Sequence, residues 1–266
     1  MTVKSTIFCG CSYTQGIGLK LIESDPDLWV NIIHGTTPHL AKTQLINRGI
    51  GGYSNEQIFL SAVKNVLDND CSYLFVAWTS LNRLTINPSV ETYTTSVYLE
   101  RAEIPDININ PNLTISGKYI ENIRDRFFDL THEHYALVKI LEYTALIDKL
   151  CRSRNIRVFF INAILPTDPG YFVHVIEPER LPSETTPHTQ KNFNLATRDD
   201  NEYWQIYDKA HQAYQDTGGL SCDWLNLDHG FRKHFYVDKG VDNLHPGPTS
   251  HKLFGNFIQQ KLLDHL

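Results

Sequence analysis

The amino-acid sequence repeats one pattern, in which a short run rich in apolar residues stops at a turn and a helix-like pattern follows. The runs cover residues 6–9, 44–46, 73–77 and 156–161. Short, mostly apolar runs without strict alternation are typical of strands that are buried on both faces of a parallel sheet. The alternation of these strands with helices therefore predicts an α/β fold.

Helix signals separate the predicted strands. The segment Ser24-Asp25-Pro26-Asp27 predicts a helix start, followed by the apolar stripe Leu28, Trp29, Ile32 and Ile33. Ser54 and Gln57 form a capping box, and amphipathic patterns cover 137–150 and 202–215. A last helix follows Pro246, and we expect it to bury Leu253, Phe254, Phe257, Ile258 and Leu262.

Two stretches interrupt the alternation. Residues 86–128 have weak periodicity and many Asn and Pro residues, and 165–198 contains five Pro among mixed polar residues. Long stretches of this kind inside a domain are commonly functional excursions. We expect a single domain over 1–266 with insertions at about 86–128 and 165–200.

Composition narrows the choice of partners and compartment. The chain has 41% hydrophobic residues and a formal net charge of -6, without a basic stripe. This excludes nucleic acid and anionic membrane as predicted partners. The amino terminus lacks the apolar region of a signal peptide, and no apolar run approaches the about 20 residues of a membrane helix. We expect a cytoplasmic protein, which a virus or a lysing cell could still release.

The sequence predicts neither a disulfide framework nor a cofactor. The five cysteines have no C-x-x-C spacing, so reduced thiols are expected. His132 and His134 occupy alternate positions that point apart on a helix, which argues against a metal site. The glycine turns lack G-x-G-x-x-G spacing, and no phosphate-binding loop motif is present.

Ser12 lies where open α/β sheets place their functional residues, directly after the carboxyl end of a strand. Asn47 to Ser54 is a second glycine-dense turn after a strand, and its backbone N–H groups are expected at the same edge. Ser12 is the candidate nucleophile. The alternative is a turn or capping residue that makes one hydrogen bond.

Several segments resemble the motif blocks of the SGNH, or GDSL-type, hydrolase superfamily. Gly10 to Gly16 resembles the first block, Asn47 to Ser54 resembles the second with Gly52 at its glycine position, and Asp242-x-x-His245-Pro246 resembles the last. The resemblance implies a three-layer α/β/α fold with a mostly parallel, flavodoxin-like sheet. It also implies hydrolysis of an acyl ester through an acyl-enzyme formed on Ser12.

The chemistry of a serine nucleophile requires the same partners. A hydroxyl needs a base to take its proton, and His245 can serve near neutral pH. Asp242, three residues earlier, can orient the imidazole. The alternative is a loop at a helix entry in which Asp242 caps and His245 packs.

The oxyanion of such a reaction needs hydrogen-bond donors. We expect them from the backbone N–H groups of Ser12 and Gly52 and from the side chain of Asn82, with Ser80 as the alternative to Asn82. The third block departs from the family, since Trp78 to Arg83 stands where Gly-x-Asn-Asp is usual. Arg83 could pair with a substrate anion or form an ordinary surface ion pair.

The first block also departs from the family, because Cys11 occupies the position of its Asp. A buried cysteine can fill that turn as a small apolar group. Cys11 is also an alternative nucleophile, since thiolates are intrinsically stronger, but the turn presents Ser12.

Two functions therefore remain open. One is an esterase or acyl hydrolase acting on a small-molecule or carbohydrate ester, such as a sugar O-acetyl group, or an enzyme that transfers the acyl group to a sugar. The other is a non-catalytic binding or structural module, for example of a virus particle. No motif indicates the substrate or the oligomeric state.

Overall fold

The computed structural model describes residues 3–80, 83–87, 95–98, 107–110, 113–119, 133–164, 223–225 and 230–266. Within these residues the main sheet has the strand order β2-β1-β3-β8-β9, and every neighbouring pair is parallel. Its strands are β1 (Ser5–Gly10), β2 (Gln44–Gly49), β3 (Cys71–Trp78), β8 (Arg157–Asn162) and β9 (Asp223–Trp224). This order is the flavodoxin-like one, so the predicted α/β fold is confirmed.

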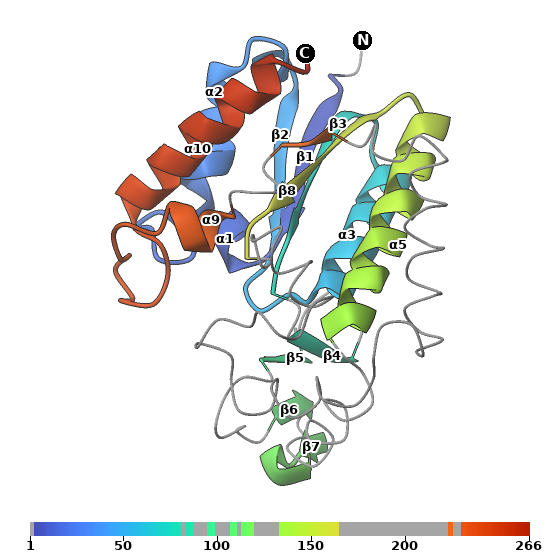
Figure 1. Cartoon of the computed structure of the whole chain (residues 1–266), viewed down its shortest axis with the longest axis vertical. Coiled ribbons are helices and arrows are strands. Elements are labelled where there is room, and N and C mark those ends of the chain that lie inside the picture. Colours follow the sequence, from blue (N-terminus) through green and yellow to red (C-terminus); the bar gives the residue numbers. More distant parts are fainter. Residues whose placement is uncertain are drawn as a thin grey trace, which may run out of the picture.

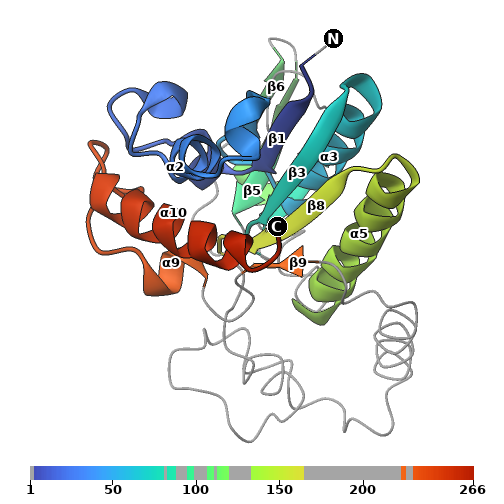
Figure 2. The same cartoon turned by 90° about the horizontal axis from the view of Figure 1, so that it is seen from above.

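Helices cover both faces of the sheet (Figures 1 and 2). α2 (Trp29–Thr36) and α10 (Pro248–Leu263) lie together on one face, and α3 (Asn55–Asp68) and α5 (Glu133–Ser153) lie together on the other. The result is a three-layer α/β/α arrangement, as expected.

Short elements connect these layers. They are α1 (Ser12–Gln15), η1 (Ile22–Ser24), η2 (Leu40–Lys42) and α9 (Phe231–His234). β4 (Arg83–Asn87), which begins just before the insertion expected at about 86–128, pairs antiparallel with β5 (Thr95–Tyr98). Within that region, β6 (Ile107–Asn110) pairs antiparallel with β7 (Leu113–Ile115).

A stack of aromatic rings across three strands forms the centre of one face. Phe8 stacks on Phe75 with ring centroids 4.4 Å apart, and Phe75 stacks on Phe159 at 5.0 Å. Trp29 of α2 meets Phe8 edge-on at 5.6 Å and Phe254 of α10 at 5.5 Å. Each fully buried ring contributes about 1.5–3 kcal/mol through removal from water. The stack therefore fixes the sheet and both helices of this face together.

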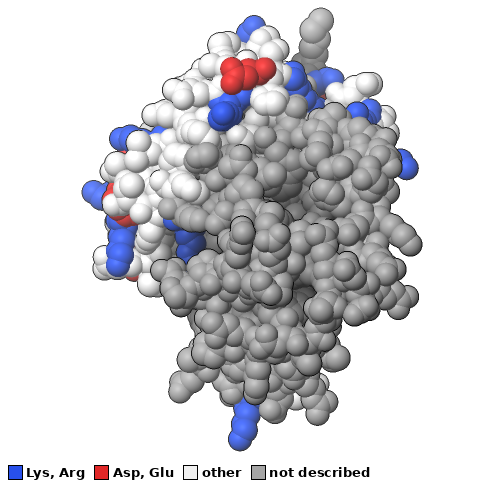
Figure 3. Space-filling model, in the orientation of Figure 1, with Lys and Arg blue, Asp and Glu red and all other residues white. Residues whose placement is uncertain are grey.

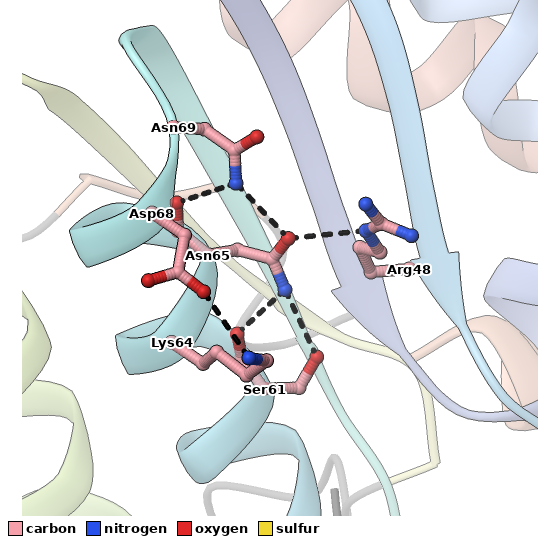
Figure 4. A network of polar contacts seen from close by, with 6 residues as sticks. All are labelled: Arg48, Ser61, Lys64, Asn65, Asp68 and Asn69. Carbon is pink, nitrogen blue, oxygen red and sulfur yellow. Dashed lines mark hydrogen bonds and ion pairs between the residues drawn. The ribbon is translucent and has the colours of Figure 1, made fainter. Parts of the chain in front are cut away.

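On the other face, a polar network joins α3 to β2 (Figure 4). Arg48 donates from Nε to Oδ1 of Asn65 at 3.0 Å, and the Asn65 amide donates to the Ser61 carbonyl at 2.8 Å. Asn69 donates to the Asn65 carbonyl at 2.9 Å. Asn65 is buried, so these bonds satisfy polar atoms that would otherwise be costly to enclose.

Two further observations concern the distribution of charged side chains and the character of the helices. On the described part of the face in Figure 3, Lys and Arg side chains are scattered, with Asp and Glu side chains among them. No described helix combines the length and the apolar character that crossing a membrane requires.

Two sequence predictions about helices are wrong in detail. α2 begins at Trp29, because the Asp25 carboxylate accepts from the Leu21 and Asp27 amides and shapes a turn there. Leu253 is 46% exposed, whereas Ser250, His251 and Gly255 are buried on α10.

The remaining predictions about helices, cysteines and insertions either agree with the structure or fall outside the described residues. The capping box of Ser54 and Gln57 is present at the start of α3. The four described cysteines are free and buried. The helix expected at 202–215 and the insertion expected at 165–200 lie outside the described residues, as do Cys222 and His132.

His251 is a buried histidine that makes no polar contact within the described part of the chain. Its side chain is 0% exposed, and neither ring nitrogen has a hydrogen-bond partner among the described residues. The ring lies edge-on to Phe231 with centroids 5.0 Å apart. Burial lowers the pKa of His251 to about 3, although Asp238 and Asp25 oppose that shift.

This burial predicts that His251 makes the fold sensitive to acid. Between about pH 6.5 and pH 3 the unfolded chain binds a proton that folded His251 does not, so the free energy of unfolding falls as the pH falls. His251→Leu should remove that contribution and flatten the dependence. Urea unfolding at pH 7 and pH 4.5 measures it.

His39→Leu is the matched control, because His39 is exposed. It retains His251 and should therefore keep the contribution of His251 to the pH dependence. An equal loss of stability between pH 7 and pH 4.5 in His251→Leu and the wild type would contradict the assignment.

Candidate active site

Ser12 is the first residue of α1, two positions after the end of β1. The helix begins because the Cys11 carbonyl accepts from the Thr14 and Gln15 amides, both at 3.0 Å. Ser12 is buried. Its backbone N–H and its hydroxyl make no hydrogen bond to another described residue. An N–H group at this position, without an acceptor among the described residues, can donate to an anion.

α1 lies against the ends of two neighbouring strands. Gly10 of β1 pairs in register with Gly49 of β2. A Cβ at Gly49 would overlap the backbone of Thr14 and Gln15, so this close approach requires glycine. Asn47 adds a bond from Nδ2 to the Thr14 carbonyl at 2.8 Å. The carboxyl ends of β1 and β2 therefore hold α1 between them.

A tight turn follows β2 and carries Gly52. The Tyr53 amide donates to the Ile50 carbonyl at 3.2 Å, and Gly52 has φ 85, as the third residue of a type II turn requires. The Gly52 N–H makes no hydrogen bond to another described residue. Because β1 and β2 are parallel, this turn lies at the same sheet edge as Ser12.

Asp242 and His245 form the other half of the candidate site. Oδ2 of Asp242 is 2.6 Å from Nδ1 of His245, and Oδ1 accepts from the backbone amides of Leu244 and His245 at 3.0 Å each. Partial burial would raise the pKa of Asp242, but these hydrogen bonds and the His245 charge lower it to about 2. Asp242 is therefore ionised near neutral pH.

The ionised carboxylate determines the tautomer of His245. A carboxylate only accepts hydrogen bonds, so Nδ1 of His245 must carry the proton that joins it to Asp242. In the neutral ring Nε2 then has a free lone pair. An imidazole in this state can act as a base through Nε2.

The loop that carries the pair is closed at its base. Asp238 accepts from the Thr249 and Ser250 amides at 3.0 and 2.7 Å, and its carbonyl accepts from the Gly247 amide at 2.9 Å. The Gly240 amide donates to the His245 carbonyl at 2.8 Å. These bonds fix the loop to the start of α10.

The same loop packs against the segment after α1. The Val241 amide donates to the Gly18 carbonyl at 2.8 Å, and a Cβ added at Gly18 would lie 2.8 Å from Cβ of His245. The rings of Tyr13 and His245 lie edge-on with centroids 6.0 Å apart. His245 thus lies beside the helix of Ser12, although no hydrogen bond joins the two side chains.

The segment after β3 is held from α3. Oδ1 of Asn55 accepts from the Thr79 amide at 2.8 Å, and Nδ2 donates to the carbonyls of Thr79 and Ser80 at 3.1 and 3.2 Å. Ser80 is buried, and Nη1 of Arg83 donates to the Tyr53 carbonyl at 2.9 Å, beside Gly52. Asn82, the predicted side-chain donor, lies outside the described residues.

Cys11 is fully buried at the N-cap of α1 and makes no side-chain capping bond. It therefore fills space in the turn. Two other side chains of this region have raised pKa values: burial raises the pKa of Tyr13 to about 12 and that of Cys9 to about 12. Both stay protonated near neutral pH.

Sequence reasoning missed the residues that hold the site together. Gln15, Asn55 and Asp238 each bind backbone atoms of a distant segment. Such contacts have no local pattern. Asn47 has a local signal, because its Oδ1 accepts from the Gly49 amide in an Asx-type turn.

The Asn55 contacts predict a loss of stability when the side chain is removed. Asn55→Ala leaves the buried Thr79 N–H without its acceptor, so the free energy of unfolding should fall by about 1–3 kcal/mol. Urea unfolding measures the change. Asn256→Ala, on the exposed side of α10, should change it by less than about 0.5 kcal/mol. Equal effects of the two substitutions would contradict the role of Asn55.

Comparison with known proteins gives structural likenesses only. No family model and no curated protein match the chain. A lipase/acylhydrolase from Enterococcus faecalis is 14% identical, with 99% of this chain and 97% of that chain covered and a TM-score of 0.44. The acetyl xylan esterase AlAXEase is 14% identical, with 98% and 99% covered and a TM-score of 0.44. A catalytic mutant of Axe2, an acetylxylan esterase from Geobacillus stearothermophilus, is 8% identical, with 98% and 96% covered and a TM-score of 0.46.

Proposed function

We propose that the chain is a serine hydrolase that cleaves an acyl ester, with a small-molecule or carbohydrate ester such as a sugar O-acetyl group as its substrate. The observation that carries the proposal is the Asp242–His245 pair. It leaves Nε2 of His245 as a base, on a loop packed beside the helix that begins at Ser12.

In this proposal Ser12 Oγ attacks the carbonyl carbon of the ester while its proton passes to Nε2 of His245. Asp242 holds the ring and stabilises the imidazolium that forms. The Ser12 and Gly52 N–H groups donate to the oxyanion of the tetrahedral intermediate. The intermediate then breaks its C–O bond, and the alcohol leaves with the proton from His245.

Water completes the cycle by the same steps. It attacks the acyl-enzyme as His245 takes its proton, and the acid leaves as Ser12 regains a proton. A sugar hydroxyl in place of water would give acyl transfer. Asn82 or Ser80 is the proposed third oxyanion donor, because both follow the strand next to β1.

A fluorophosphonate probe tests the nucleophile directly. Wild-type protein should be labelled, with the modified peptide mapping to Ser12. Ser12→Ala should not be labelled, whereas Cys11→Ser should be labelled normally because the Cys11 side chain only fills space. Labelling that persists in Ser12→Ala, or that is lost in Cys11→Ser, would overturn the assignment of the nucleophile.

Steady-state hydrolysis of p-nitrophenyl acetate tests whether Ser12 and His245 act as a unit. Ser12→Ala and His245→Ala should each reduce kcat at least about 10³-fold, and the double variant should lose little more than either. Losses that simply multiply in the double variant would show two independent roles.

Wild-type protein that takes up no fluorophosphonate and cleaves none of a panel of short-chain and sugar acetates would overturn the function as a whole. Ser12 would then be a buried turn residue of an α/β fold without this chemistry.

A further inference from the structure

Gln15 makes a long-range contact between the two segments of the candidate oxyanion site. It is the last residue of α1, and its Oε1 accepts a hydrogen bond from the backbone amide of Gly51 at 2.7 Å. Gly51 is the residue before Gly52, in the turn closed by Ile50 and Tyr53. The bond therefore joins the helix that begins at Ser12 directly to the turn that carries Gly52.

The turn has other contacts, but they lie at its start and at its end, whereas Gln15 binds Gly51 in the middle. The Ile50 amide donates to the Gly10 carbonyl at 3.1 Å, which anchors the start of the turn to β1. Nη1 of Arg83 donates to the Tyr53 carbonyl at the end of the turn. Between these two anchors, Gln15 binds the middle of the turn, and it comes from the helix of Ser12.

The geometry of the turn makes this contact important for Gly52. Type I and type II turns differ in the orientation of their central peptide, here the one between Gly51 and Gly52, because ψ of the second residue and φ of the third differ between them. The N–H of Gly52 belongs to that peptide, so a flip would reverse its direction. A hydrogen bond at the Gly51 amide, the neighbouring peptide group, restrains such a change.

We propose that Gln15 is a positioning residue, which holds the Gly51–Gly52 turn against α1 so that the N–H groups of Ser12 and Gly52 keep a fixed mutual arrangement. This inference rests on the proposed function of these two groups. Gln15 acts through Gly52 and does not itself need to touch the substrate.

The expected effect is on the chemical step. Removal of a whole oxyanion donor costs about 10²–10³-fold in rate, and a donor that is present but less well fixed should cost less. Gln15→Met keeps the length and half-buried position of the side chain but removes the acceptor oxygen. Its kcat for p-nitrophenyl acetate should fall about 10-fold with KM unchanged, since acylation and deacylation use the same donors.

Gln259→Met is the matched control, because Gln259 is also half-buried and also makes one side-chain bond to a backbone atom, from Nε2 to the Thr36 carbonyl at 3.3 Å. It should leave kcat and KM unchanged. Gln15→Glu keeps an oxygen acceptor for the Gly51 amide, and its kcat should exceed that of Gln15→Met. This second variant also tests the inference if Gln15→Met fails to fold.

The outcomes separate this inference from the proposed function. A wild-type protein that is not labelled by fluorophosphonate at Ser12 overturns the proposed function. A labelled, active wild type in which Gln15→Met keeps full kcat, or in which KM alone changes, overturns the positioning role. Gln15→Glu with a kcat no higher than that of Gln15→Met overturns it as well.

Discussion

The close approach of α1 to the ends of β1 and β2 is the constraint on which the candidate site depends. Gly10 and Gly49 are paired in register, and a Cβ at either would overlap Thr14 or Gln15. The helix can therefore sit across both strand ends only because side chains are missing there. This close approach sets the position of Ser12 relative to the turn after β2. The loop that carries His245 then packs against Gly18, in the segment that follows α1.

Much of the fold follows from local patterns in the sequence. Three of the four apolar runs became the largely buried strands β1, β3 and β8, because a strand covered on both faces needs little besides apolar residues. The run at 44–46 became β2, an edge strand whose residues are mostly half-buried or exposed. The start of α2 was misplaced, since Asp25 uses its carboxylate to bind turn amides, which a helix-start pattern does not distinguish from capping. Leu253 was misassigned because α10 buries the small and polar residues Ser250, His251 and Gly255.

The candidate site also has a part that the sequence predicts and a part that it does not. Asp242 and His245 are three residues apart, so a pattern in the sequence could predict their hydrogen bond. The contacts of Gln15, Asn55 and Asp238 span 36, 24 and 12 residues and end on backbone atoms, where any residue type could stand. These three contacts can be identified only in the folded structure, because a side chain that binds a distant backbone atom produces no recognisable sequence pattern.

The buried cysteines have a practical consequence for work on this protein. Burial raises the pKa of Cys9 and Cys151 to about 12, so both remain thiols near neutral pH, and all four described cysteines are enclosed. Alkylating reagents attack thiolates that solvent can reach. Reaction at Cys9 or Cys151 would therefore require the chain to open, and the rate of alkylation at these positions can serve as a chemical clock for unfolding.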